Sequence, residues 1–216
     1  MLTILLTRHG HTDRSEPEQY LGQRIAARLT ERGVADAAKL AERLSGVALD
    51  RVISSPLARA AETATIVAGG AGIEVERRLA ELDYGAWEGL TVDEIEERFP
   101  GERDQYDANP STHHVGDGES GEDVARRVSA FLDDLLAWAE AAGTPRTCLI
   151  VGHSSVNRVL LAVCLGVPLR DYRRRFRQDW ANLTVLRWSD RSAGAMMLLA
   201  NDVAHLRGLR GATWAE

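Results

Sequence analysis

Residues 2–6 form an uninterrupted apolar and β-branched run, Leu-Thr-Ile-Leu-Leu. A strand with one face in water would alternate apolar and polar residues, so this run predicts a strand covered on both faces, as in a parallel α/β sheet. The chain becomes polar directly afterwards, at Arg8, His9 and Gly10. Open α/β sheets bind their ligands at the carboxyl ends of their strands. The run therefore predicts a buried strand that leads into a site containing an arginine and a histidine.

A second apolar run ends in the same way. Residues 147–151, Thr-Cys-Leu-Ile-Val, are followed at once by a glycine and His153. Parallel strands point in one direction, so the two runs should bring His9 and His153 to the same edge of the sheet. A third short strand stops at Ser-Ser-Pro, residues 54–56, and Arg59 begins the next helix, where exposed N–H groups and the helix dipole favour anions. This combination predicts a phosphate site.

The order of the remaining elements predicts the fold class. Capped segments with helical spacing of apolar residues alternate with short apolar runs, which is typical of α/β proteins. The expected helices lie within residues 30–44, 57–68, 91–99, 120–143 and 154–165. The other expected strands are residues 50–55 and 73–75, with a hairpin of residues 183–188 and 195–200 that completes the sheet. We predict a single domain over residues 1–216, a three-layer α/β/α sandwich with a mostly parallel central sheet.

Residues from about 100 to 118 interrupt this regular order. They include few apolar residues and show no clear period, so we expect an irregular excursion over the surface. Such an excursion is also a candidate lid over the site.

Charge and composition argue against several classes of partner. The formal net charge of -6 comes from interspersed residues of both signs, which favours neither nucleic acid nor an anionic membrane as a partner. The first residues do not have the pattern of a secretory leader, and no later segment has about 18 consecutive apolar residues. Cys148 and Cys164 lie in apolar runs, where free cysteines pack as small hydrophobic residues. We expect a soluble, cytoplasmic protein without a disulfide.

Five motifs together make the chain resemble the histidine phosphatase superfamily, in its phosphoglycerate-mutase-like branch. The first motif is Thr-Arg-His-Gly at residues 7–10, and the others lie at residues 54–64, 79–89, 118–120 and 151–154. They follow the order of the family and span residues 3 to about 188. The resemblance implies the α/β fold of that family and a phosphatase that uses neither a metal nor another cofactor.

The resemblance also implies roles for five residues. His9 is the expected nucleophile that takes the phosphoryl group. Arg8, Arg59 and His153 are expected to hold the non-bridging oxygens while charge redistributes in the in-line transition state. Glu81 is the expected general acid, which protonates the leaving oxygen and then, as a carboxylate, activates the water that cleaves the phosphohistidine.

The loop after the first strand departs from the family pattern. Many relatives have glutamate or glutamine where this chain has His11, and a tryptophan-asparagine pair where it has Arg14 and Ser15. That asparagine helps to hold phosphate, and Gln23 is a candidate substitute for it. Ser154, in the last motif, is a further candidate for substrate binding. We expect a reshaped first loop and an altered substrate preference.

A metal site is an alternative interpretation of the same histidines. His9 and His11, with His153 and either Glu81 or Asp83, have the ligand chemistry of zinc or iron sites. The five motifs account for these residues without a metal, so we predict no metal ligands.

The basic tract of residues 173–177, Arg-Arg-Arg-Phe-Arg, has two interpretations. Such a run usually forms a solvated or partner-facing surface. The alternative is that one of its arginines reaches the rim of the pocket and holds a carboxylate or a second phosphate. Trp180, close behind it, is expected to pack in the core or in an interface, like the other tryptophans.

The sequence thus predicts a metal-independent phosphomonoesterase that acts through a phosphohistidine on a small phosphorylated metabolite. A cofactor-dependent phosphoglycerate mutase is the nearest alternative, and it would return the phosphoryl group to a second hydroxyl. A non-catalytic phospho-ligand-binding protein is the second alternative, although it would need neither the nucleophile nor the acid. The sequence leaves the substrate undetermined, and also leaves open a homodimer through the last strands or the basic tract.

Overall fold

One six-stranded sheet, in the order β3-β2-β4-β1-β5-β6, organises the structure, a computed structural model that describes residues 1–70 and 72–207. Its parallel part consists of β1 (Leu2–Arg8), β4 (Arg146–Gly152), β2 (Arg51–Ser54) and β3 (Ile73–Val75). The hairpin of β5 (Leu183–Trp188) and β6 (Met196–Asp202) extends the sheet, with β5 antiparallel to β1. The predicted mostly parallel sheet with a terminal hairpin is confirmed.

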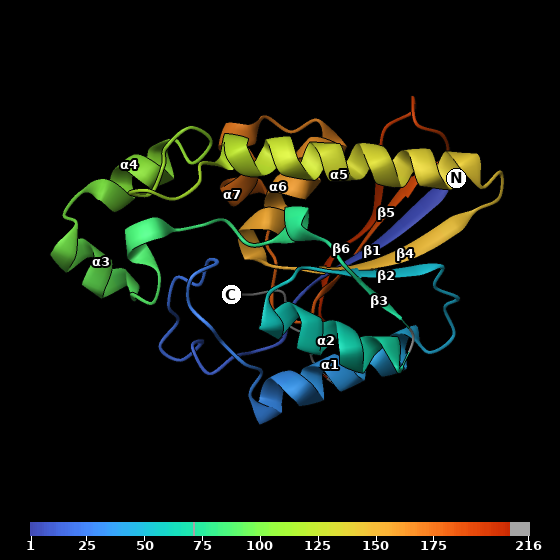
Figure 1. Cartoon of the computed structure of the whole chain (residues 1–216), viewed down its shortest axis with the longest axis horizontal. Helices are drawn as coiled ribbons and strands as arrows, with labels where there is room; N and C mark the ends of the chain where they lie inside the picture. The colour runs from blue at the N-terminus through green and yellow to red at the C-terminus, as the bar shows by residue number, and fades with distance from the viewer. Residues whose placement is uncertain (71, 208–216) are drawn as a thin grey trace.

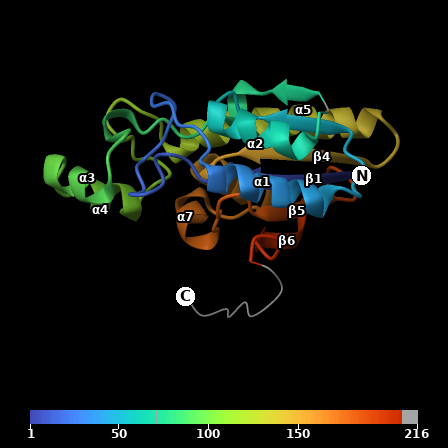
Figure 2. The same cartoon turned by 90° about the horizontal axis from the view of Figure 1, so that it is seen from below.

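Helices cover both faces of this sheet (Figures 1 and 2). One face carries α1 (Glu31–Leu44) and α2 (Ala58–Ala68), and the other carries α5 (Gly121–Ala141) and α6 (Ser154–Leu165). The shorter elements are η1 (Arg77–Leu79), η2 (Gly85–Trp87), α3 (Val92–Arg98), α4 (Glu102–Ala108), η3 (Leu169–Asp171) and α7 (Tyr172–Arg175). The three-layer α/β/α arrangement predicted from the sequence is confirmed.

The uninterrupted apolar run of β1 is explained by burial on both of its faces. Ile4 and Leu6 belong to the core beneath α5 and α6, whereas Leu5 belongs to the core beneath α1 and α2. The second run, in β4, is divided in the same way, and its Cys148 is a buried free thiol, as is Cys164 in α6. These two strands do not alternate apolar and polar residues because each of their faces packs against an apolar core.

Side-chain caps mark the starts of α1, α3 and α5, as the sequence predicted. The Thr30 side chain accepts a hydrogen bond from the Gly33 amide at the start of α1. Capping boxes begin α3 at Thr91 and α5 at Ser120. Gly69, with φ 57°, ends α2 in the left-handed conformation that glycine adopts without strain.

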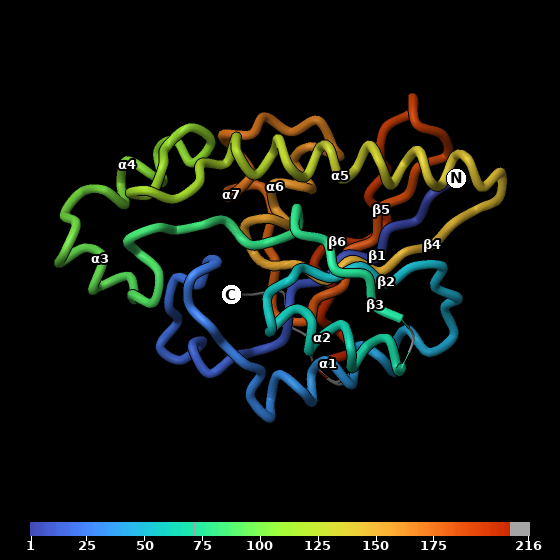
Figure 3. Tube along the Cα trace, viewed as in Figure 1, coloured from blue at the N-terminus to red at the C-terminus, as the bar shows by residue number. Residues whose placement is uncertain are grey.

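The expectation of an irregular stretch at residues 101–118 is wrong in part, because it contains α4. Tyr106 anchors this helix: its ring packs edge-to-face on Trp87, with centroids 5.6 Å apart, and its hydroxyl lies 3.0 Å from that of Tyr172. A single buried aromatic residue gives no helical period, so the sequence pattern does not show α4. Figure 3 shows this segment, with α3, projecting beyond the end of the sheet near the loop that follows β1.

Among residues 1–70 and 72–207, the helices are too short or too polar to cross a membrane. The single-domain prediction for residues 208–216 lies outside the described residues.

Truncation of a fully buried residue of β1 should measure how strongly the fold depends on this strand. Ile4→Ala is expected to lower the free energy of unfolding by about 2–5 kcal/mol, because it removes apolar contacts and leaves a cavity. Val34→Ala, at a position that is 46% exposed in α1, should change it by less than about 0.5 kcal/mol. Urea unfolding of both variants measures the difference, and equal effects would contradict the role assigned to β1.

Candidate active site

The ends of neighbouring strands bring two histidines together. β1 and β4 end in register, with Arg8 opposite Gly152. His9 and His153 follow directly, and the centroids of their rings are 5.2 Å apart. The adjacent strand β2 leads into Ser55, whose hydroxyl lies 2.7 Å from Nε2 of His153. The meeting of His9 and His153 at one edge of the sheet, predicted from the two apolar runs, is therefore observed.

A backbone carbonyl fixes the tautomer of His9. Its Nδ1 lies 2.7 Å from the carbonyl oxygen of Gly10, and a carbonyl can only accept, so Nδ1 carries the hydrogen. In the neutral ring this leaves the lone pair on Nε2. Burial, and then the positive charges of Arg59 and Arg8, lower the pKa of His9 well below its usual value. His9 is therefore a neutral imidazole with an available Nε2 at neutral pH.

Backbone carbonyls hold the two arginines of the site. Arg59, only 2% exposed, donates to the carbonyl of Gly22 at 2.8 Å, and Arg8 donates to the carbonyl of Gln178 at 3.1 Å. Burial lowers the pKa of both guanidinium groups. Within the described residues, the Nε atoms of both arginines and Nδ1 of His153 are buried without a hydrogen-bond partner. The two guanidinium Nε–H groups are buried donors without partners, which suits an anion with several oxygens.

The carboxyl group of Glu81 is held by the first turn of α6. Its Oε2 accepts from the amide of Ser155 at 3.0 Å, and its Oε1 accepts from the amides of Val156 and Leu82 at 2.9 and 2.8 Å. These amides fix the carboxyl group, which is part of a side chain only 3% exposed. The N-terminus of α6 therefore positions Glu81.

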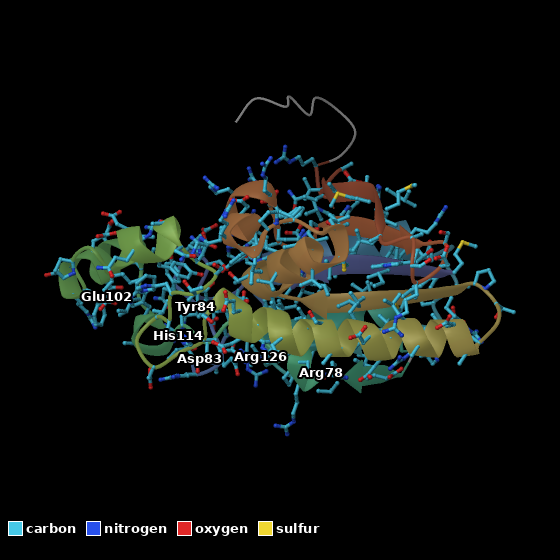
Figure 4. The ribbon with its side chains drawn as sticks, turned by 90° about the horizontal axis from the view of Figure 1, so that it is seen from above. Arg78, Asp83, Tyr84, Glu102, His114 and Arg126 are labelled. Carbon is cyan, nitrogen blue, oxygen red and sulfur yellow. The ribbon has the colours of Figure 1, made fainter. Side chains whose placement is uncertain are left out.

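A cavity of about 560 Å³ lies over this edge of the sheet. Four of the residues that the sequence predicted to be catalytic or substrate-binding line it: Arg8, His9, Glu81 and Ser154. Tyr84 also lines it, with its hydroxyl 2.7 Å from that of Ser155, and Figure 4 places Tyr84 between the start of α5 and the projecting α3–α4 segment. Arg59 and His153 are buried beside His9 without forming part of the cavity wall.

Comparison with protein families gives the same assignment as the five motifs. The model of the histidine phosphatase superfamily, branch 1, matches residues 4–201. The chain belongs to this superfamily. As a histidine phosphatase it is an enzyme, which confirms the class predicted from the sequence.

Individual relatives cover almost the whole of this histidine phosphatase. Phosphoserine phosphatase 1 of Hydrogenobacter thermophilus is 31% identical, and the match covers 95% of each chain. A protein of Enterobacter sp. named probable phosphoglycerate mutase GpmB is 29% identical, again with 95% of each chain covered. The solved structure of Bacillus stearothermophilus YhfR is 31% identical, superposes with a TM-score of 0.84, and covers 95% of this chain and 100% of its own.

Gln23 lies beside the site rather than in the cavity wall. Its side-chain amide donates to the backbone carbonyl of Glu81 at 2.8 Å and to the carboxylate of Glu119 at 3.1 Å. These hydrogen bonds hold the backbone at Glu81 in place. The contact between Gln23 and substrate stays a prediction.

The basic tract is divided between the cavity and the surface. Arg173 and Arg177 line the cavity, as the rim interpretation requires for one arginine, whereas Arg174 and Arg175 are exposed. Trp180, expected in the core or in an interface, lines the cavity instead, with its ring centroid 5.0 Å from Cζ of Arg8. An isolated tryptophan in a loop gives no sequence signal that distinguishes these places.

His11, considered as a metal ligand, is turned toward other partners. Its Nδ1 lies 2.9 Å from the hydroxyl of Thr30 and its Nε2 lies 3.2 Å from the carboxylate of Glu16. Across residues 1–70 and 72–207, no three side chains of His, Cys, Asp or Glu are grouped as a metal site.

Glu88 is a structural residue of the site that the sequence reasoning missed, although it lies within the third motif. Its carboxylate accepts from three successive amides, those of Gln23, Arg24 and Ile25, at 2.7, 2.6 and 3.0 Å. The same loop presents the Gly22 carbonyl to Arg59. Glu88 therefore fixes the loop that in turn holds a buried arginine of the site.

Replacement of this carboxylate should loosen Arg59 without removing any group from the cavity wall. Glu88→Gln exchanges one acceptor oxygen for an NH₂ group, so at least one of the three amides loses its partner. We expect KM for p-nitrophenyl phosphate to rise about tenfold in steady-state assays. Glu96→Gln, at an exposed position of α3, is the matched control. Equal KM values for the two variants would show that the loop does not depend on Glu88.

The lowered pKa of His9 has a measurable consequence. The neutral ring persists as the pH falls through 6.5, and it is lost only below that value, because the pKa in the folded enzyme lies lower. The kcat/KM profile should therefore show no loss attributable to a histidine between pH 8 and 6.5, once the ionisation of the substrate has been measured separately. An acidic limb at or above pH 6.5 that belongs to His9 would contradict this assignment.

Proposed function

We propose that this protein is a metal-independent phosphomonoesterase that acts through a phosphohistidine at His9 on a small phosphorylated metabolite. The observation that carries the proposal is the fixed tautomer of His9, which directs the lone pair to Nε2 in a residue that lines the cavity. A histidine with a depressed pKa is neutral and nucleophilic at neutral pH. Membership in the histidine phosphatase superfamily supports the same chemistry.

In the first step, Nε2 of His9 attacks phosphorus and the bond to the ester oxygen breaks. Arg8, Arg59 and His153 bind the non-bridging oxygens and disperse their charge. The hydrogen on Nδ1 stays on the ring and continues to donate to the Gly10 carbonyl, which stabilises the positive charge that forms there. Glu81 donates its proton to the leaving oxygen, so an alcohol departs.

In the second step, water hydrolyses the phosphohistidine. The Glu81 carboxylate takes a proton from the water as its oxygen attacks phosphorus, and the bond between phosphorus and Nε2 breaks. Inorganic phosphate leaves, His9 returns to its neutral form, and Glu81 is again protonated.

The cavity favours hydrolysis over mutase chemistry. A mutase must keep water from the phosphohistidine while a second hydroxyl takes the phosphoryl group. A cavity of about 560 Å³ with many charged side chains in its wall has room for water beside a small substrate. We therefore propose a phosphatase rather than a phosphoglycerate mutase, and turnover distinguishes both from a binding protein.

Removal of the nucleophile tests this function directly. We expect the purified protein to release phosphate from p-nitrophenyl phosphate equally well with and without EDTA. His9→Ala should lower kcat by about four orders of magnitude or more, as the loss of a covalent nucleophile does elsewhere. His114→Ala, in the exposed loop before α5, is the control and should retain activity. Rapid quenching followed by peptide mass spectrometry should find the phosphoryl group on His9.

Other outcomes would select the alternatives. Interconversion of 3-phosphoglycerate and 2-phosphoglycerate in the presence of 2,3-bisphosphoglycerate, without phosphate release, would identify a mutase. Binding of phosphate esters without turnover at any pH would identify a binding protein. Loss of activity in EDTA that returns with added metal would overturn the metal-independent mechanism.

A further inference from the structure

Arg158 lines the cavity, and no carboxylate among residues 1–70 and 72–207 pairs with its charge. It lies in α6 one helical turn after Ser154, and both residues line the cavity. Its Nε is buried with no hydrogen-bond partner, and no ion pair among the described residues includes Arg158. Partial burial of a guanidinium removes some of its hydration, and here no hydrogen bond or ion pair with the described residues offsets that cost.

Of the other five arginines in the cavity wall, Arg14 is exposed to solvent and the rest are paired with carboxylates. Arg177 pairs with Asp179 at 2.8 Å, and Arg173 pairs with Asp107 at 3.1 Å. Arg8 has a carboxylate partner in Glu18 at 3.3 Å. Each of these cations therefore has a neighbouring anion supplied by the protein, which Arg158 does not.

The cavity wall is rich in positive charge. Six arginines and three carboxyl groups line it, and Asp107, which lies outside the wall, pairs with Arg173 and Arg103. Arg158 also repels Arg8, since its charge adds to the effect of burial in lowering the pKa of Arg8. A further negative charge in the bound substrate, placed beside Arg158, would relieve this repulsion.

We propose that Arg158 binds a second anionic group of the substrate, a carboxylate or a further phosphate, so that the natural substrate is a phosphomonoester with at least two anionic groups. The guanidinium offers two parallel donors to such a group, and the Ser154 hydroxyl one turn away on the same helix offers a third. This inference rests on the proposed phosphatase function and names the class of its substrate.

Substrates that differ in one group test the proposal. In 3-phosphoglycerate a carboxylate replaces the terminal CH₂OH of glycerol 3-phosphate, and in glycerol 1,3-bisphosphate a second phosphate extends from the same carbon. The wild-type enzyme should hydrolyse 3-phosphoglycerate, glycerol 1,3-bisphosphate or both with a kcat/KM at least about tenfold higher than that for glycerol 3-phosphate. If 3-phosphoglycerate is preferred, the second anionic group is a carboxylate, and if glycerol 1,3-bisphosphate is preferred, it is a phosphate.

Substitution of Arg158 assigns that preference to a residue. Arg158→Met keeps the apolar part of the side chain and removes the charge. It should lower the ratio of kcat/KM for the preferred doubly anionic ester to kcat/KM for glycerol 3-phosphate by about 10- to 100-fold. Arg158→Lys keeps the charge and should retain part of the ratio. Arg175→Met, at an exposed position outside the cavity wall, should leave the ratio unchanged. Because a ratio is measured, partial misfolding of a variant affects both substrates equally and cancels.

Two results would overturn the inference while leaving the phosphatase intact. The first is a wild-type enzyme that hydrolyses all three esters with equal kcat/KM. The second is a ratio that Arg158→Met does not change. If instead the wild-type enzyme hydrolyses none of these esters and no p-nitrophenyl phosphate, then the proposed function fails, and the inference fails with it.

Discussion

The in-register parallel pairing of β1 with β4 is the constraint on which the site depends. Because the two strands end together, Arg8 and Gly152 stand opposite each other, and the residues that follow both strands share one edge. A shift of one residue in this register would turn one histidine to the opposite face of the sheet. Two apolar cores hold the register, since each strand buries alternate residues in both. The relative position of His9 and His153 is therefore set by the packing of the two central strands, β1 and β4.

Main-chain carbonyls hold the buried Arg59 guanidinium by hydrogen bonds, while the Glu81 and Glu88 carboxylates favour its charge without bonding to it. Arg59 is nearly inaccessible, yet its hydrogen bonds go to the carbonyls of Leu21 and Gly22. A carboxylate partner would neutralise the guanidinium and compete with an anionic ligand, whereas a carbonyl orients it and leaves its charge intact. Burial, together with the same positive charges, lowers the pKa of His9 and of His153 and so keeps both rings neutral at neutral pH. The positive charges of Arg8 and Arg59 therefore attract an anion and also help to preserve the lone pair on Nε2 of His9.

Much of the fold and part of the site could be predicted from the sequence because they depend on local patterns. The double-sided burial of β1, the caps at Thr30 and Ser120, and the meeting of two strand-end histidines all follow from periodicity and strand direction. The α4 helix does not, since it depends on the tertiary contacts of Tyr106. Arg158 was missed because its significance lies in a partner that it lacks, and a sequence does not show missing partners.

The attachment of both Glu81 and Arg158 to α6 has a consequence for substrate length. Amides of the first turn of this helix hold the Glu81 carboxyl, and Arg158 projects from the helix about one turn later, a rise of about 5.4 Å. The spacing between the two groups is set by a single rigid rod rather than by two loops that can move independently. The distance between the Glu81 carboxyl group and the Arg158 side chain therefore depends on α6, and changes in the surrounding loops should affect it little.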